Sequence, residues 1–431
     1  ETETTYVMEN VLAMKEEAYV NNIDNYTSTL SQELSMTRYP GKSLETYSTD
    51  WDAVVKTIYE YEDFGPELNK TGYFEDDLKP VIAGLTTPEE KILAILSYVK
   101  TSVKWNNYLG YSCDDGVKKA YKDKIGNIAE INLMLTAMLR FAGLTVNPVL
   151  VSTRSNGIAA FPNRTAFNHV IVAIENSEDM ILLDATEKYS MPNVLPLRDL
   201  NWFGRLIRKD GTSTEVDLMP KILSREAVNM SVVLKSDSSL EGKIRRQLSD
   251  HEALEFRQNK LLTSKEIYLE ELENQNNSIE ISDYKRDNDL DLSKPIMESY
   301  SFKDTKDIEI INDKIYVSPM LFSTTKENPF KQEIREYPVD FGYPFQNKYN
   351  INIEIPEGYA VESMPQPMNI ATGENLGSFR YIIGNTGNTI QVSVTTTINT
   401  AIVSSDYYDV LKDFYQQMID KQNEKIILKR I

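Results

Sequence analysis

The sequence contains very little cysteine and histidine. Its 431 residues include one cysteine, Cys113, and two histidines, His169 and His251. A single cysteine excludes an internal disulfide framework and a cysteine-rich zinc site. Two histidines leave little for a multi-histidine metal or catalytic centre. We therefore expect neither a metal ion nor a cofactor in this protein.

Long apolar runs and basic clusters are also missing. No apolar run reaches the roughly 18–20 residues that a membrane helix needs, so we expect a chain that does not span a membrane. The 46 Lys and Arg residues are outnumbered by 65 Asp and Glu residues, and the net charge of −19 argues against a nucleic-acid partner. The first residues lack the basic and apolar regions of a signal peptide, which we expect to be absent or already removed.

The apolar content, 41% of the residues, is sufficient for two or three domains. Mixed helical and strand patterns predict the α+β class, with domain boundaries at 1–50, 51–224 and 225–431. Residues 1–50 alternate polar and apolar positions, which favours strands and the tail of an N-terminal β domain whose beginning is absent. Residues 225–431 are predicted to form a β-sandwich-like domain with a helical insert (250–274) and a closing amphipathic helix (405–421).

The central segment carries the most informative pattern. Thr87 and Pro88 are typical of a helix start, and residues 127–142 form an apolar run that predicts a buried helix. Strands are expected at 146–153, 167–175 and 180–184. A buried helix followed by strands that carry a histidine and an aspartate is the layout of a papain-like or transglutaminase-like core. In such cores a cysteine thiolate at the helix start is the nucleophile, and the aspartate orients the histidine.

The spacing of the last two strands supports a histidine–aspartate pair. Residues 176–179 suit a hairpin turn. A turn centred between positions 176 and 177 pairs residues whose numbers sum to 353, which places His169 opposite Asp184. The Cβ atoms of such a pair lie about 5 Å apart.

Residues 86–196 resemble the transglutaminase-like core found in envelope proteins of Bacteroidetes-type bacteria, where it lies between two β-rich domains of unknown function. The motif Gly-Asp-Cys-Lys-Asp of active members corresponds here to the sequence from Gly126 to Glu130. The Phe-Asn-His sequence ending at His169 and the Leu-Leu-Asp-Ala-Thr sequence around Asp184 also fit. Residues 1–60 resemble the end of the N-terminal β domain, and residues 225–431 resemble the C-terminal one.

The resemblance fails at the nucleophile, because Ile128 stands where active members have cysteine. Isoleucine cannot attack a carbonyl, so we expect a catalytically inactive protein with His169 and Asp184 as a relic pair. A degenerate cleft lined by Asn127, Ile128, His169 and Asp184 would bind a protein or peptide partner, or the chain would serve as a scaffold. The resemblance implies a periplasmic or outer-membrane-associated location.

Other candidate sites are weaker. Cys113 with His169 could replace the lost nucleophile in a cysteine hydrolase, but two adjacent aspartates would raise the thiol pKa. The loop from Asp287 to Glu298 has the spacing of an EF-hand, yet Leu292 stands at its glycine position. His251 is expected to be an exposed residue in the first turn of a helix. The hypothesis of a carbohydrate-binding module has only the expected β-sandwich in its support, so we rank it last.

Overall fold

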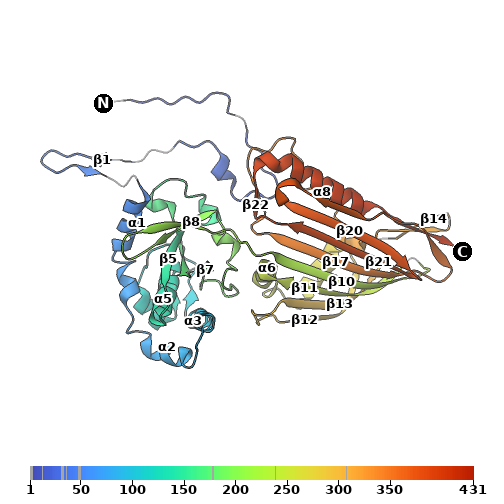
Figure 1. Cartoon of the computed structure of the whole chain (residues 1–431), viewed down its shortest axis with the longest axis horizontal. Helices are drawn as coiled ribbons and strands as arrows, with labels where there is room; N and C mark the ends of the chain where they lie inside the picture. Colours follow the sequence, from blue (N-terminus) through green and yellow to red (C-terminus); the bar gives the residue numbers. More distant parts are fainter. Residues whose placement is uncertain are drawn as a thin grey trace.

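The computed structural model describes residues 3–11, 13–30, 34, 36–46, 50–176, 179–237, 239–306 and 308–431. Figure 1 shows a helix-rich part and a β-rich part joined near α6 (Asp250–Lys260). The expected α+β class is confirmed. The described residues of 6–13 and 18–20, which were expected to form strands, are not in strands. The two-residue strands β1 (Met36–Thr37) and β2 (Glu45–Thr46) pair with each other.

Five helices build one side of the helix-rich part. They are α1 (Trp51–Glu60), α2 (Glu75–Ile82), α3 (Pro88–Ser102), α4 (Val117–Asp123) and α5 (Ile128–Phe141). Thr87 caps α3 reciprocally with Glu90, as the Thr-Pro-Glu-Glu sequence predicts. Helix α5 is buried from Ile128 to Leu139, which confirms the buried helix expected from its apolar composition.

One face of α5 packs on an antiparallel sheet. Its strands, in the order β7-β6-β5-β8-β9, are β7 (Met180–Leu183), β6 (His169–Glu175), β5 (Val146–Val151), β8 (Phe203–Ile207) and β9 (Ser213–Asp217). Val170 and Val172 of β6 share a core with α5, whereas Ile171 and Ala173 pack into a second core on the other face. The sheet is therefore covered on both faces.

A large mixed sheet dominates the β-rich part. Its order is β12-β13-β11-β10-β17-β21-β20-β19. The strands are β12 (Glu280–Asp287), β13 (Ile296–Asp304), β11 (Leu240–Ser249), β10 (Ser224–Leu234), β17 (Phe345–Glu354), β21 (Thr389–Ile398), β20 (Gly377–Thr386) and β19 (Met368–Ala371). Strands β10 and β17 run parallel, and the other pairs are antiparallel.

A smaller sheet, α6 and two further helices share the core of the large sheet. The smaller sheet has the order β14-β15-β23-β18, formed by Ile308–Ile311, Lys314–Val317, Ile426–Arg430 and Tyr359–Ser363. The helices are α7 (Lys265–Gln275) and α8 (Tyr408–Asn423), and α8 lies beside the large sheet in Figure 1. Strand β23 was not expected, because the sequence was taken to close on the helix. It extends the chain into the smaller sheet.

The N-terminal segment ties the two parts together. Between residues 15 and 26 it runs over both parts, and we call it the strap. The Glu17 carboxylate pairs with Arg335 at 3.1 Å and accepts a hydrogen bond from Tyr408. Asn22 donates to the carbonyl of Arg154 in the helix-rich part. The strap therefore contacts both sides of the joint directly.

Candidate functional site

The start of α5 is the place where a transglutaminase-like core carries its nucleophile. Asn127 is the N-cap, and its side chain accepts from the backbone N–H of Glu130, whose carboxylate accepts from the N–H of Asn127. Ile128 is the first helical residue. The Asn127 side chain also donates to the carbonyl of Ser112 at 2.9 Å, so the segment before α4 lies against this helix end.

All four residues expected to line the degenerate cleft are buried. Ile128, His169 and Asp184 are 0% exposed, and Asn127 is 1% exposed. Ile128 belongs to the main apolar core of this part. The region around Ile128 is thus filled by the chain's own side chains, and no partner side chain reaches Ile128 without a rearrangement.

The structure brings His169 and Asp184 together, but in a different register from the expected one. Strand β6 pairs Val172 with Leu183, so paired numbers sum to 355 rather than 353. A shift of two residues keeps both side chains on one face of the sheet and places them diagonally. Their closest atoms, His169 Nε2 and Asp184 Oδ2, are 3.7 Å apart.

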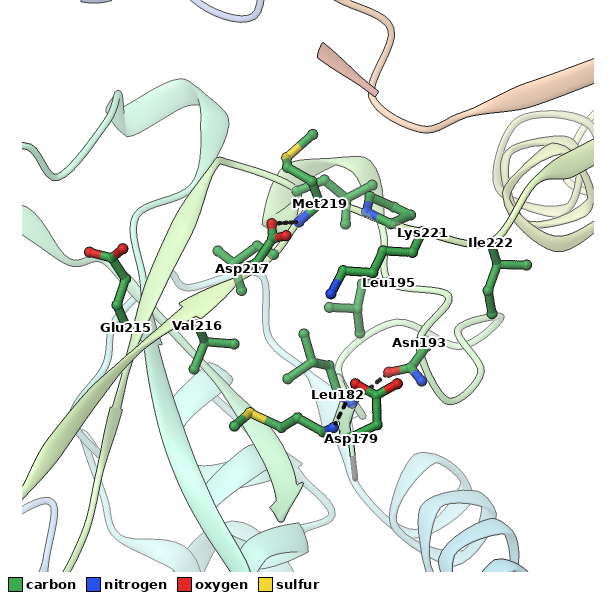
Figure 2. Close-up of a pocket in the computed structure, with 14 residues that line it drawn as sticks. Asp179, Leu182, Asn193, Leu195, Glu215, Val216, Asp217, Met219, Lys221 and Ile222 are labelled. Carbon is green, nitrogen blue, oxygen red and sulfur yellow. Dashed lines mark hydrogen bonds between the residues drawn. The ribbon is translucent and has the colours of Figure 1, made fainter. Parts of the chain in front are cut away.

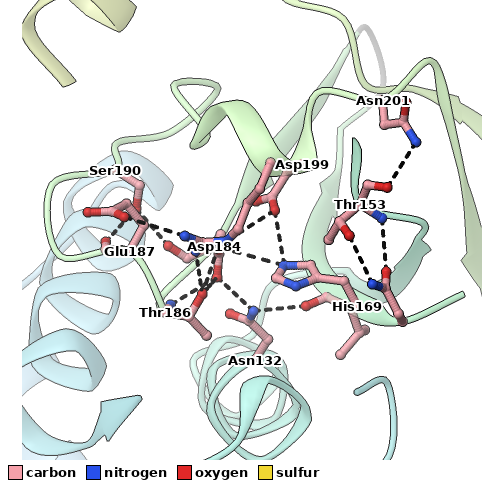
Figure 3. A network of polar contacts seen from close by, with 12 residues as sticks. Asn132, Thr153, His169, Asp184, Thr186, Glu187, Ser190, Asp199 and Asn201 are labelled. Atoms are coloured by element: carbon pink, nitrogen blue, oxygen red, sulfur yellow. Dashed lines mark hydrogen bonds and ion pairs between the residues drawn. The ribbon is translucent and has the colours of Figure 1, made fainter. Parts of the chain in front are cut away.

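A third buried group, Asp199, lies closer to the histidine. Its Oδ1 is 3.2 Å from His169 Nε2, and its side chain is 0% exposed. Figure 3 shows that both carboxylates face the same ring nitrogen of His169, Nε2. Neither ring nitrogen of His169 and neither carboxylate oxygen of Asp199 has a hydrogen bond of good geometry within the described part of the chain.

Asp184 is the best anchored member of the cluster. Asn132, one turn after Ile128 on α5, donates to Asp184 Oδ1 at 2.8 Å, and the backbone N–H of Thr186 donates to the same oxygen. Arg198 donates to Oδ2 at 2.8 Å. Burial by itself would raise the pKa of Asp184, but His169 and Arg198 hold that pKa well below its ordinary value. Asp184 therefore favours its ionised form near neutral pH.

Asp199 has the opposite behaviour. Burial raises the pKa of its carboxyl to about 7, because His169 and Arg198 offset the loss of water only in part and Asp184 adds repulsion. Two buried carboxylates beside each other thus titrate far apart. Such a pair is typical of a site shaped for acid–base work.

His169, Asp184 and Asp199 are residues of the kinds that bind metal ions. One ligand atom each from His169, Asp184 and Asp199 lies within 4.8 Å of the others. However, the Arg198 guanidinium is 2.8 Å from Asp184 and 3.6 Å from Asp199. It supplies the positive charge that a cation would bring, and a metal would have to displace it. The residues present fit a guanidinium-neutralised cluster better than a metal site.

Cys113 is buried at 4% exposure near the start of α5. Burial, followed by repulsion from Glu67, Glu130 and Asp63, raises its pKa. The pKa of the thiol is raised, as expected. The cause differs from the expected one, because burial and carboxylates from elsewhere in the chain raise the pKa, and the two adjacent aspartates are not among those carboxylates. The described contacts include no hydrogen bond between Cys113 and His169.

His251 does not lie at the surface as expected. His251 is buried at 1% exposure and stacks on Tyr343 with ring centroids 4.9 Å apart, and burial lowers its pKa to about 4. The loop resembling an EF-hand closes around the Arg257 guanidinium, which donates to the carbonyls of Asn288, Asp289, Asp291 and Lys294. Glu298 lies elsewhere, paired with Arg246. These loop carbonyls are therefore occupied by hydrogen bonds from a guanidinium.

A cavity of about 270 Å³ opens beside the β7-β6-β5-β8-β9 sheet of the helix-rich part, on the face that is turned away from α5. Leu182, Leu195 and Val216 form an apolar wall, and Asp179, Asp217 and Lys221 lie around it (Figure 2). None of the residues at the start of α5 lines it. This cavity is therefore separate from the residues at the start of α5.

Residues 77–178 match the model of the transglutaminase-like superfamily. Over this segment the helix-rich part is similar to transglutaminase-like domains. Residues 313–428 match a domain of unknown function, DUF3858, which covers most of the smaller sheet, α8 and half of the large sheet. The search of curated proteins found no significant match.

A crystal structure from Parabacteroides distasonis, described as a "putative protease", is similar with a TM-score of 0.49 and 14% identity. The likeness covers 93% of this chain and 63% of that one, so this chain spans less than two thirds of its length. At this level of similarity it carries no argument about function. No helix in the described part of the chain is long and apolar enough to cross a bilayer.

The sequence analysis missed Asn132, Arg198 and Asp199. Asn132 could have been noticed as an amide on the inner side of an otherwise apolar helix, four residues after Ile128. Arg198 and Asp199 lie in a loop beyond the residues that match the superfamily model, and no local pattern marks them. Only the return of this loop onto the sheet places them against His169.

Proposed function

We propose that this chain is a catalytically inactive transglutaminase-like protein that acts as a scaffold or protein-binding component of a bacterial envelope. The observation that carries the proposal is Ile128, fully buried at the first turn of α5 where a nucleophile would stand. A side chain without a lone pair forms no acyl-enzyme intermediate.

The remaining cluster supports the same proposal. His169 has no thiol within hydrogen-bonding distance, and its neighbours Asp184 and Asp199 are fully buried. Arg198 neutralises the cluster from the side of the loop. These groups serve the fold by tying α5, the sheet and the loop after Leu197 together. The envelope location and a protein partner extend the proposal by family resemblance.

The alternative is a hydrolase that uses Cys113. One observation favours it, since Asn127 holds the segment of Cys113 against the start of α5. Against it stand the buried thiol and the carboxylates of Glu67 and Glu130, which raise its pKa and so disfavour the thiolate.

Activity assays separate the two readings. The full chain would be incubated with casein and a fluorescent primary amine to detect transglutamination, and with labelled casein to detect proteolysis. We expect neither product above a heat-denatured control. Turnover that disappears in the Cys113→Ser variant would establish the hydrolase alternative, and turnover that survives in it would contradict both readings.

The scaffold role has a separate test. Native purification from the source, followed by crosslinking and mass spectrometry, should recover a partner in fixed stoichiometry. Crosslinks would then locate the contact surface on this chain. A protein that purifies as a monomer under several gentle extraction conditions would count against a scaffold.

A further inference from the structure

The large sheet has one covered face and one open face. Along β10, Val228, Met230 and Val232 are buried in the core, whereas Asn229 and Ser231 between them are exposed. The pairing of β10 with its neighbours aligns Asn229 with Arg245 of β11 and Asn350 of β17. We call the outward residues of strands β13, β11, β10, β17, β21 and β20 the open face.

The open face has a charge opposite to that of the chain. Its carboxylates, Glu241 and Glu354, lie near one end of the strands. Its cations are Arg225, Lys243, Arg245, Lys303, Lys348 and Arg380. Among the described residues none of these six cations has an ion-pair partner, while Glu241 is already paired with Lys235. A patch of unpaired positive charge thus stands on a chain with net charge −19.

Uncharged hydrogen-bonding groups fill the spaces between the cations. Asn350 donates to Asn229 at 3.1 Å, and Ser393 donates to Asn350 at 3.0 Å, which makes a continuous row across three strands. Asn352 and Gln391 lie opposite each other two residues further along the same strands. Each amide offers both donors and acceptors to a ligand.

Three of the six cations are evenly spaced across the sheet. Arg245, Lys348 and Arg380 lie on β11, β17 and β20, which are every second strand in the sheet. With neighbouring strands about 4.8 Å apart, successive cations are roughly 10 Å apart across the sheet. Double-stranded DNA carries one charge per roughly 1.7 Å of its axis. The open face therefore suits a polyanion with sparse charges and polar groups between them.

We propose that the open face binds an anionic polysaccharide, whose carboxylate or sulfate groups contact the cations and whose hydroxyls contact the amide and hydroxyl rows. A protein partner fits less well, because the outward positions of these six strands hold no aromatic side chain, and protein interfaces are anchored by such residues. The net negative charge does not prevent binding. At physiological salt the Debye length is about 8 Å, so carboxylates on distant surfaces are screened.

Affinity electrophoresis of the full chain tests the proposal. The gels would contain alginate, polygalacturonate, chondroitin sulfate, neutral dextran or poly-L-glutamate. We expect at least one anionic polysaccharide to retard the protein, dextran to leave it unaffected, and added salt to weaken the retardation. No retardation by any anionic polysaccharide would overturn the proposal. Poly-L-glutamate, which has no hydroxyls, should retard the chain less, and equal retardation would assign the face to acidic proteins instead.

Matched variants locate the site. The double variant Arg245→Glu with Lys348→Glu reverses two exposed charges of the open face and should weaken binding about tenfold. The control Lys118→Glu with Lys122→Glu makes the same change in net charge on the exposed side of α4 and should bind as the parent does. Equal weakening in both variants would show a general charge effect and refute the assignment to the open face.

Discussion

Replacing the buried Asp199 by asparagine should change how the stability of the transglutaminase-like core depends on pH. The carboxyl has a pKa of about 7 in the folded protein, against an ordinary value of 3.8. Between these values the folded state holds a proton that the unfolded state has lost. Asp199 therefore lowers the free energy of unfolding as pH rises through this window, by about 1.4 kcal/mol per pH unit.

The full difference of about three pH units corresponds to about 4 kcal/mol, of which about 3 kcal/mol falls between pH 5 and pH 7. Asp199→Asn removes the titrating group while keeping its shape. The variant should equal the parent in stability near pH 4 and exceed it by about 3–4 kcal/mol at pH 8. Asp184 does not change the pH dependence between pH 5 and pH 8, because its lowered pKa confines its effect on stability to acid conditions.

Urea unfolding at pH 5, 6, 7 and 8, followed by tryptophan fluorescence, measures this difference. Trp51, Trp105 and Trp202 all lie in the helix-rich part, so the signal reports the relevant core. Asp210→Asn is the matched control. The pKa of Asp210 is lowered by its hydrogen bonds with Thr212, so its titration falls outside this range. Parallel pH profiles for the parent and Asp199→Asn would refute the reasoning about this cluster.

Four further outcomes are expected. Ile128→Ala removes a fully buried side chain and should lower the stability of the core by about 2–5 kcal/mol in the same fluorescence assay. Cys113 should resist a thiol reagent in the native state and react fully in urea, because it is buried and its pKa is raised. Arg257→Met leaves four loop carbonyls without their donor and should lower the calorimetric melting temperature, with no rescue by calcium. Glu17→Gln weakens the strap and should speed tryptic cleavage after Lys15.

Each of these outcomes has a clear opposite. An Ile128→Ala variant as stable as the parent would mean that the cleft is open in solution. Rapid native labelling of Cys113 would favour the hydrolase reading. A calcium-stabilised Arg257→Met variant would show that the loop is a cation site after all, and unchanged cleavage in Glu17→Gln would show that the strap is held mainly by other contacts.

The elements that the sequence predicted well are those whose signals are local. The start of α5 is set by the capping box that Asn127 and Glu130 form. Its burial follows from its sequence, because apolar residues occupy nearly all faces of the helix. The position of Ile128 as the first helical residue follows from the same N-terminal sequence of α5. The paired strands β10 and β11 also follow from local alternation.

The strand register and the tertiary contact partners of single residues could not be predicted from neighbouring residues in the sequence. The pairing of β6 with β7 is shifted by two residues from the expected one, because turn length alone does not determine where the first hydrogen bond of a hairpin forms. His251 was expected at the surface from its place in a first turn, yet Tyr343, distant in sequence, covers it. The pairing of Arg257 with the acidic loop depends in the same way on a helix packed against that loop.

The sequence by itself therefore determined the fold class, the buried helix and the position of Ile128 at its start, since each is written in adjacent residues. Only the tertiary structure decided what surrounds Ile128 and His169. Asp199 approaches His169, and Arg198 pairs with Asp184, from a segment that returns from outside the matched motif, so that the histidine–aspartate pair becomes a cluster of four side chains. The open face of the large sheet is likewise decided by which strands become neighbours, because cations that are far apart in the sequence are gathered only across the sheet.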